Sequence, residues 1–454
     1  MPVNDSILST KASKGTSALR GRVGGSSRPS LILRPYQIKG IQYLRQHNGR
    51  GSLIWEMRLG KTITTIRFIK QRKDSKRILI VAPYSALCSW YEDLIQDGSK
   101  NIHLIYKIPP KDRTELLFSS EKEIGWFLVN KEAFLYCDYL RLQWDSIIVD
   151  ETWLANPKAK ITKYFLKYTQ ARYRILLTGT PAPESELQYF TQLHWVNPGV
   201  LGKSYWDYRI RNFRPEGMKW RITMKGRHKL ARVLVDNCSV LTRKDVGLQK
   251  EKIFEKRVIQ LLPATLKKYE EAESGIYDGK ILKFAGQWWN EMRRLCSGKE
   301  KEVELLDLLN GELKNERVII WCDYVEEVER VAGLLCCAFI HGTTPPLQRD
   351  GMRKHFLKKG KYLVAQPQCW KWGTNLAGVD TVIFFSMPQG LMTWQQVCER
   401  TVNLTSLKSL LIISLVAENT IDESIIESLY EKENRQKQLD RIRRGIESRR
   451  AFAA

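Results

Sequence analysis

The sequence predicts an α/β protein of two lobes, each built on a parallel sheet covered by helices. Three observations predict this class. The 454 residues are too many for one compact core. Hydrophobic residues make up 43% of the chain, which is enough for two cores. Short apolar runs alternate with helical stretches in two separate series, a pattern typical of parallel sheets whose strands are joined by helices.

The first lobe is expected over residues 31–183. Its strand-like runs are Ser52–Trp55, Ile78–Ala82, Trp126–Val129, Ser146–Val149 and Arg174–Leu177. Residues 1–30, which precede it, are rich in Ser, Gly, Lys and Arg and contain a single acid, Asp5. They lack the apolar core of a secretory signal and the amphipathic stretch of a mitochondrial transit peptide. We therefore expect a flexible basic arm.

The second lobe is expected over residues 301–429. Its strand-like runs are Arg317–Trp321, Ala338–Ile340, Tyr362–Ala365, Thr381–Phe385 and Leu410–Leu415. Residues 184–300 between the lobes predict a mainly helical, basic insertion. Its aromatic residues, at Trp206, Trp220, Trp288 and Trp289, are expected in the core rather than stacked on bases. A charged helix and tail are expected over 430–454, either as a solvated face or lying along phosphates.

The charge of the chain indicates the class of partner. Lys and Arg total 74 against 49 Asp and Glu, a net charge of +25. Nucleic acid is the usual partner of so basic a protein, although charge alone leaves an anionic membrane surface open. No apolar run approaches the roughly 18 residues that span a bilayer. The nine cysteines form no C-x-x-C, which favours a reducing compartment over a zinc site or disulfides, and we expect a cytoplasmic protein.

The first chemical signal is the stretch from Trp55 to Thr62, which follows a strand and opens a helix. In that context backbone N–H groups and the helix N-terminus face an anion. Lys61 is expected to reach the β- and γ-phosphates of ATP, and the Thr62 hydroxyl to hold Mg²⁺. The usual first glycine is absent and Trp55 takes its place, so an ordinary turn between strand and helix remains the alternative for this stretch alone.

The second signal is a buried strand that ends in two adjacent acids, Asp150 and Glu151. Because strand residues alternate in direction, these carboxylates are free to serve different roles. Asp150 suits Mg²⁺ ligation, and Glu151 can position the attacking water. The two signals together predict an ATP-hydrolysing site.

In this order the motifs resemble helicase superfamily two, over roughly residues 31–430. The segment around Arg34 and Gln37 looks like that family's adenine-reading segment, and Leu59 and Gly60 belong to its phosphate loop. Pro83, Tyr84 and Ser85, with Trp90, look like motif Ia, which touches the nucleic-acid backbone. Leu177–Pro181 is similar to motif III, which couples hydrolysis to strand movement. The resemblance implies that each lobe is RecA-like and that Thr178, Thr180, Gly342 and Thr343 also contact nucleic acid.

Several segments are more similar to the Swi/Snf branch of that superfamily. They are Glu56–Thr62, Asn156–Pro157 and Leu241–Val246. In the second lobe, Gly373–Leu376 resembles motif V and Gln396–Arg400 resembles the first half of motif VI. This resemblance implies that Gly373, Asn375 and Gln396 contact the nucleotide and that Arg400 reaches its γ-phosphate.

The chain departs from the family's pattern at three positions. Trp153 stands where the acidic box usually carries histidine, and Arg58 replaces a glycine of the phosphate loop. Asn403 stands where motif VI has its second arginine. An arginine that reaches the γ-phosphate can supply roughly 10³–10⁵ in rate, so its loss predicts slow or differently gated hydrolysis.

The sequence as a whole predicts an ATP- and Mg²⁺-dependent motor that translocates on duplex DNA without base preference and remodels or anneals branched DNA. It is expected to act as a monomer. Its short length resembles the motors of phages and other mobile elements. Two alternatives remain: a strand-separating helicase, and a nucleic-acid-binding scaffold whose ATPase has decayed.

Overall fold

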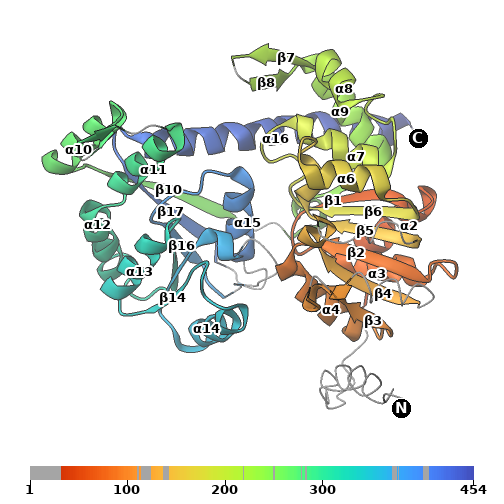
Figure 1. Ribbon diagram of the computed structural model, residues 1–454, viewed down its shortest axis with the longest axis horizontal. Helices are drawn as coiled ribbons and strands as arrows, with labels where there is room; N and C mark the ends of the chain where they lie inside the picture. Colours follow the sequence, from red (N-terminus) through yellow and green to blue (C-terminus); the bar gives the residue numbers. More distant parts are fainter. Residues whose placement is uncertain are drawn as a thin grey trace, which may run out of the picture. The chain divides into compact units, whose positions relative to one another are not determined.

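The computed structural model describes residues 32–109, 112–113, 124–135, 143–217, 219–248, 251–277, 279–281, 284–370, 376, 378–401 and 408–453. By its internal contacts the chain divides into two units, Met1–Ile32 and Leu33–Ala454. The basic arm predicted over residues 1–30 lies outside the described residues. All of the described helices and strands belong to the second unit (Figure 1).

The first lobe is built on a seven-stranded sheet in the order β3-β4-β2-β5-β6-β1-β9. All of its paired strands are parallel. The strands are β1 (Arg50–Trp55), β2 (Arg77–Ala82), β3 (Ile102–Leu104), β4 (Gly125–Asn130), β5 (Trp144–Asp150), β6 (Ala171–Thr178) and β9 (Cys238–Leu241). The five strands expected from apolar runs in this lobe are all present. Parallel strands need crossover connections, and helices supply them here.

Alternation along the strands places a core on each face of this sheet. Ile78 and Ile80 of β2 belong to the core beneath α2 (Pro35–Gln46), α3 (Lys61–Lys70) and α4 (Tyr84–Gln96). Leu79 and Val81 belong to the opposite core, with α6 (Lys160–Tyr168) and α7 (Tyr189–Val196). A strand covered on both faces is apolar throughout, which is why these runs can be recognised in the sequence.

The second lobe repeats this design on a six-stranded sheet in the order β10-β17-β16-β13-β15-β14, again with all paired strands parallel. The strands are β10 (Lys252–Ile259), β13 (Val318–Trp321), β14 (Ala338–Ile340), β15 (Tyr362–Ala365), β16 (Thr381–Phe384) and β17 (Leu410–Ala417). The helices of this lobe include α12 (Lys299–Asn310), α13 (Val325–Leu334), α14 (Pro346–Lys359) and α15 (Leu391–Thr401). Two buried clusters again lie on the two faces. The prediction of two parallel-sheet lobes is therefore confirmed.

The stretch between residues 184 and 300 is mostly helical, but it also completes both sheets. Its helices are α7, α8 (Tyr205–Asn212), α9 (Met224–Asn237), α10 (Pro263–Glu273) and α11 (Ala285–Cys296), with short hairpins β7 (Phe213–Glu216)–β8 (Lys219–Ile222) and β11 (Ile276–Tyr277)–β12 (Lys280–Ile281). Within it, β9 pairs with β1 of the first sheet and β10 pairs with β17 of the second. Both lie at the ends of their sheets, so no strand of the described residues pairs with their outer sides.

The aromatic residues of this stretch differ in their surroundings. Trp288 and Trp289 pack against the core of the second lobe, and Trp220 packs against the cluster around Phe190. Trp206, in contrast, is 54% exposed, so its expected place in the core is wrong. Its ring centroid lies 4.1 Å from the guanidinium carbon of Arg209, which is also 4.3 Å from the ring centroid of Trp220, and these contacts take the place of core packing.

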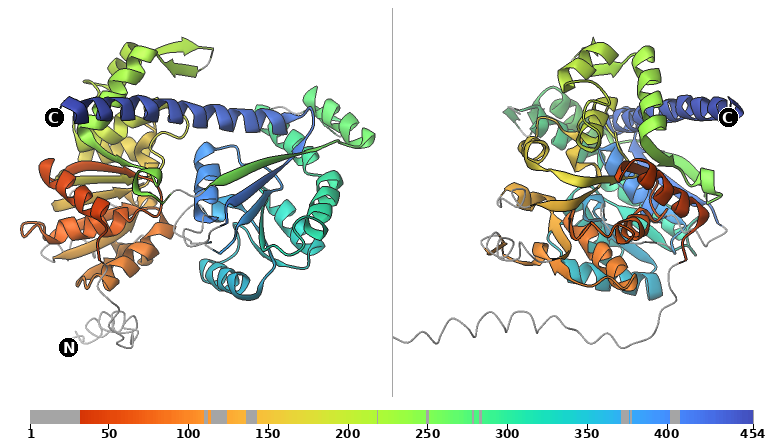
Figure 2. Two further views of the ribbon diagram at one scale, coloured as in Figure 1. Left: turned by 180° about the vertical axis from the view of Figure 1, so that it is seen from behind. Right: turned by 90° about the vertical axis from the view of Figure 1, so that its right-hand side faces the viewer.

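The last helix, α16, runs from Ile421 to Ala453 and begins before the charged segment expected at 430 (Figure 2). Its first turns contribute Ile425 and Leu429 to the core of the second lobe. Farther along, Leu439 is buried in a cluster with Phe190 and residues of α9. Among the described helices, none is both long enough and apolar enough to cross a bilayer.

Candidate ATP site and the family of the chain

The phosphate loop lies between the end of β1 at Trp55 and the start of α3 at Lys61. Leu59 is fully buried and anchors the loop in the core. Gly60 has a φ of 75° and Arg58 a φ of 67°, so the loop turns through two left-handed residues before the helix begins. Arginine adopts this conformation at a cost of order 1 kcal/mol, which glycine avoids. The loop therefore keeps its backbone shape although Arg58 has replaced the glycine.

Gln37, expected to read the adenine, closes over this loop. Its amide nitrogen donates to the carbonyl of Leu59 at 3.2 Å, and its amide oxygen accepts from the backbone N–H of Arg34 at 2.8 Å. A Cβ on Gly60 would lie 2.2 Å from the Gln37 amide nitrogen, so a larger residue here would push the Gln37 amide away from the loop. The structure thus brings the segment of Arg34 and Gln37 against that of Leu59 and Gly60, although Gln37 and Leu59 are 22 positions apart in the sequence.

The amino group of Lys61 points back into the loop, where its Nζ donates to the carbonyl of Trp55 at 2.9 Å. Thr62 follows in the first turn of α3 and is half-buried. A helix N-terminus and an ammonium group that converge on one loop form a site for a polyanion.

Asp150 and Glu151 lie at the same edge of the sheet as the phosphate loop. β5, which ends at Asp150, pairs with β6, and β6 pairs with β1 on its other side. Both carboxylates are more than nine-tenths buried. Glu151 has a φ of 69°, so the chain turns sharply directly after Asp150.

Trp90 holds the carboxylate of Asp150. Its indole Nε1 donates to Oδ2 of Asp150 at 2.8 Å, and the ring is almost completely buried. Motif Ia, to which Trp90 was assigned by resemblance, is expected on nucleic acid. This residue of the motif instead lies in the core and orients a predicted Mg²⁺ ligand.

Trp153, at the family's histidine position, packs against the hydrophobic core. It lies on the 3-10 helix η4 (Thr152–Ala155), and its ring meets Phe165 of α6 edge-on with centroids 4.9 Å apart. An indole packed in this way cannot titrate or exchange protons as a histidine would. Any coupling between the acidic box and the other motifs must therefore use other side chains.

The residues expected on nucleic acid fall into two groups by exposure. Tyr84 follows Pro83 at the start of α4, and its ring is 49% exposed and packs edge-on against Tyr106. Thr178 and Thr180 are buried, and the Thr180 N–H donates to Oγ1 of Thr178 at 3.1 Å. In this conformation the two threonines shape the turn after β6. The side chain of Ser85 is outside the described residues.

The turn after β14 contains the remaining two residues of that set. The N–H of Gly342 donates to Oε1 of Gln366 at 3.1 Å, and Arg349 donates to the Gly342 carbonyl at 2.8 Å. Oγ1 of Thr343 lies 3.0 Å from Nδ1 of His341. The turn is thus held by side chains from two other segments, and its contact with nucleic acid stays a prediction.

The second-lobe residues of the predicted ATP site are described only in part. Gln396 lies on α15 and is fully buried, and neither of its amide atoms has a hydrogen-bond partner in the part of the chain that the structure describes. Arg400 is on the same helix, but its side chain is outside the described residues, as are Gly373, Asn375 and Asn403. A buried amide without partners is costly, which makes Gln396 a candidate for a ligand contact.

Arg243 connects the phosphate loop to the motif VI helix, a link that sequence reasoning missed. Its backbone N–H and Nε both donate to Oε2 of Glu56, at 2.9 and 3.1 Å. Its Nη2 forms an ion pair with Glu399, to which Lys252 also pairs. Burial by itself raises the pKa of Glu399, but the charges of Lys252 and Arg243 outweigh burial and hold that pKa below its usual range. Glu399 is therefore a carboxylate at neutral pH, shared by two cations.

Two protein-family models match the sequence of this chain, one over most of the first half and one within the second lobe. Residues 36–288, more than half of the chain, match the model of the SNF2-related domain. This chain belongs to the SNF2-related family. Residues 300–405 also match the helicase conserved C-terminal domain, a range that includes β13 to β16 of the second lobe.

Similar proteins differ in the share of their own length that this chain covers. The chromatin structure-remodeling complex subunit snf21 of Schizosaccharomyces pombe is 29% identical over 191 residues, which cover 39% of this chain and 16% of that protein. The uncharacterized ATP-dependent helicase YqhH of Bacillus subtilis is 23% identical over 457 residues, covering 89% of this chain and 79% of that protein. Among solved structures, the SWI2/SNF2 ATPase core of Sulfolobus solfataricus in complex with dsDNA has 20% identity and a TM-score of 0.42, covering 87% of this chain and 90% of that one.

Proposed function

We propose that this chain is an ATP hydrolase that translocates along double-stranded DNA and so remodels or anneals branched DNA, such as recombination or fork intermediates. One observation carries the proposal. The phosphate loop after β1 and the acids that end β5 lie on either side of β6, at the carboxyl ends of these parallel strands. The chain in which they lie belongs to the SNF2-related family and also matches the helicase C-terminal domain.

The residues of this edge fit ATP and Mg²⁺. Lys61 and the N-terminus of α3 offer positive charge to the phosphates, and the Thr62 hydroxyl and the Asp150 carboxylate offer oxygen ligands of the kind that Mg²⁺ takes. Bound ATP with its metal would supply the phosphoryl group and neutralise the charge that develops on it. In the present conformation Lys61 is bonded to the Trp55 carbonyl, so it must exchange that partner to hold a phosphate. Glu151 would position the attacking water.

Duplex DNA as the track is supported by charge and by relatives. The net charge of +25 fits a sequence-independent grip on a phosphate backbone. Snf21 is described as a subunit of a chromatin structure-remodeling complex, and YqhH as an ATP-dependent helicase.

The test is ATP turnover measured without DNA, with single strands and with duplex, for the wild type, Lys61→Ala and the exposed control Lys73→Ala. We expect duplex to stimulate turnover more than single strands do. Lys61→Ala should abolish turnover, because the phosphates lose their ammonium partner, while Lys73→Ala should behave as the wild type. Turnover that does not depend on Lys61 with any nucleic acid would exclude the motor.

The same measurements separate the two alternatives. Stimulation by single strands together with strand separation would indicate a helicase that unwinds DNA. DNA binding without turnover would indicate a scaffold whose ATPase has decayed, an outcome that the loss of arginine at Asn403 makes worth testing. The variant Asn403→Arg then decides whether that loss is the cause, because a restored arginine should raise turnover by an order of magnitude or more.

A further inference from the structure

A basic surface lies on the last turn of α8, the outer side of α9 and the end of α16. It is formed by Arg211, Lys225, Lys229, Arg232, Arg449 and Arg450, all of which are exposed, and is called the α9 face below. Two hollows open on it. One is lined by Arg211, Lys225, Lys229 and Arg232, and the other by Arg232, Arg449 and Arg450. His228 lines both, so the hollows adjoin.

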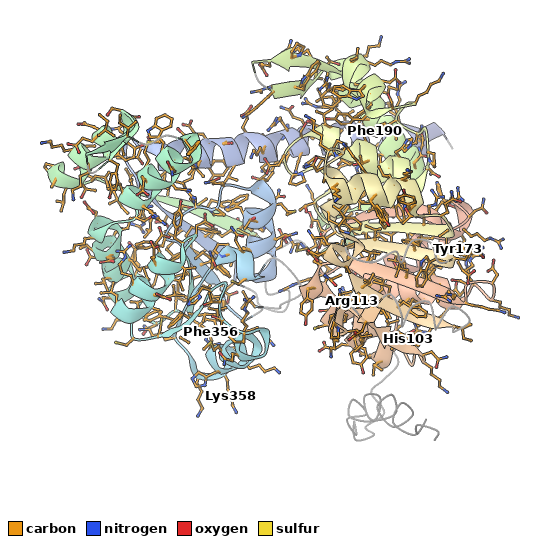
Figure 3. The ribbon with its side chains drawn as sticks, viewed as in Figure 1. His103, Arg113, Tyr173, Phe190, Phe356 and Lys358 are labelled. Carbon is orange, nitrogen blue, oxygen red and sulfur yellow. The ribbon has the colours of Figure 1, made fainter. Side chains whose placement is uncertain are left out.

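Helix α9 forms this surface because its sequence is amphipathic with a basic outer side. Lys225, Lys229 and Arg232 follow one another at helical spacings of four and three, which place them on one side. Leu230 and Leu234 are buried on the other side, in the cluster with Phe190, which Figure 3 labels. The hydroxyl of Thr223 caps the helix by accepting from the Gly226 N–H at 3.0 Å.

Most of the charge on the α9 face is not neutralised by the protein itself. Arg211 pairs with Asp207 at 2.5 Å, and Arg450 pairs with Asp236. Lys225, Lys229, Arg232 and Arg449 have no carboxylate within ion-pair distance in the part of the chain that the structure describes. Uncompensated cations this close together repel one another, so an anionic ligand would stabilise the face.

The spacing of these cations fits the phosphates of a DNA strand. From Lys225 to Arg232 is seven residues of helix, or about 10 Å at 1.5 Å per residue. Each strand of a duplex places one phosphate per roughly 3.4 Å of helix axis, so the row spans about three phosphates. The lining of the two hollows has one large apolar residue, the half-buried Ile446, whereas protein interfaces have apolar or aromatic centres.

The α9 face is separate from the DNA contacts expected of the motor. α9 leads directly into β9, the edge strand of the first sheet. Pro83 and Tyr84 follow β2, which is separated from β9 by β5, β6 and β1. In Figure 1, α9 and α4 accordingly lie at opposite ends of the first lobe.

We propose that the α9 face binds the phosphate backbone of a second segment of duplex DNA, distinct from the segment on which the motor steps. This goes beyond the proposed function and does not require ATP turnover. A motor that holds a second duplex segment would keep two arms of a branched DNA together while it moves along one of them.

The test compares two triple variants with equal changes in charge. In one, Lys225, Lys229 and Arg232 are changed to Glu. In the control, Lys314, Lys358 and Lys359 of the second lobe are changed to Glu; all three are exposed, and Lys358 is labelled in Figure 3. Affinity for a 30-base-pair duplex is measured by fluorescence anisotropy over a range of NaCl concentrations. We expect the α9 variant to lose at least about tenfold in affinity near 0.1 M salt, and its slope of log K against log salt to fall by about 2.7, or 0.9 per lost phosphate contact. The control variant should show a much smaller loss of affinity and a much smaller fall in the salt slope.

Each outcome is decisive. If the α9 variant keeps the affinity and the salt slope of the control, the proposal is overturned. It is also overturned if that variant binds duplex normally but no longer binds polyglutamate, which would indicate an acidic protein as the partner. Unfolding curves, and a second variant with Gln at the same positions, exclude a folding defect. ATP turnover at saturating duplex should keep its maximal rate in the α9 variant. Absence of ATP turnover in the wild type would contradict the proposed motor function, but the result of this binding test would still stand.

Discussion

At the scale of one residue, Trp90 is an example of a side chain whose role cannot be predicted from the sequence, because it acts through another residue. The residues of the ATP site that carry their chemistry in their own side chains, such as Lys61 and Asp150, can be recognised from type and order alone. Trp90 acts through Asp150, and Arg243 through Glu56 and Glu399. These partners are far apart in the chain, and only the fold brings them together, so no local pattern marks them.

Replacing Trp90 by Phe should slow ATP turnover while the protein stays folded. Phenylalanine retains an aromatic ring but cannot donate to Asp150, so the carboxylate loses the bond that orients it. Residues that orient metal ligands typically contribute 10–100-fold in metal affinity or activity. We expect a fall of about that size in kcat, with a higher Mg²⁺ concentration needed for half-maximal rate. Trp126→Phe is the matched control, because that ring is buried in the same core without contacting Asp150. Equal losses in the two variants would mean that packing alone is responsible.

At the scale of elements, the apolar strands were predictable and the edge strands were not. β2 and β5 are covered on both faces, so they stand out as apolar runs. β10 is a mixture of half-buried and exposed residues, with Ile259 alone of its residues buried, because only part of an edge strand is covered. It includes the charged residues Lys252, Glu255, Lys256 and Arg257. The same polarity makes it resemble a basic linker. Trp206 was misplaced for a related reason, since a stack on Arg209 can hold a large aromatic ring outside the core.

Helix α4 contains Asp93, a carboxylate that should lower the free energy of unfolding by an amount that depends on pH. Burial, followed by the charges of Glu92 and Asp97, raises the pKa of Asp93 to about 6. The folded state therefore holds this proton more tightly than the unfolded state, so ionisation destabilises the fold as pH rises from about 4 through 6. Asp93→Asn should raise the free energy of unfolding by about 1–2 kcal/mol at pH 7.5, because two pKa units correspond to at most about 3 kcal/mol before solvent screening. The gain should vanish near pH 4.

Urea unfolding at the two pH values measures this gain. Glu427→Gln, an exposed change on α16, should give no pH-dependent gain. A benefit of Asp93→Asn that is equal at pH 4 and pH 7.5 would contradict the raised pKa and would indicate better packing of the amide instead.

At the scale of the whole molecule, the cores of the two sheets contain most of the clustered buried hydrophobic residues in the described part of the chain. The cores of the first lobe are supplied by α2, α3, α4, α6 and α7, and those of the second by α10–α15 and the start of α16. The two-lobed class was predictable because each series of strands implies its own sheet. That α16 contributes side chains to clusters of both lobes was not, since its charged pattern indicates only a solvated helix.

Separate cores predict two thermal transitions, because chains with several cores depart from two-state unfolding. Because the residues proposed to hold ATP and Mg²⁺ lie largely in the first lobe, binding of the nucleotide should raise the transition temperature of that lobe. A ligand present at 100 times its Kd stabilises the state that binds it by about 2.7 kcal/mol. In differential scanning calorimetry, Lys61→Ala should abolish this shift. Phe356→Ala, in the core of the second lobe, should lower the free energy of unfolding of that lobe by about 3–5 kcal/mol and so lower its transition temperature, while the nucleotide shift stays unchanged. A single transition that both variants move together would mean that contacts such as those of α16 bind the lobes into one cooperative unit. In that case, nucleotide binding at the phosphate loop would also stabilise the second lobe against unfolding, without any rearrangement of its fold.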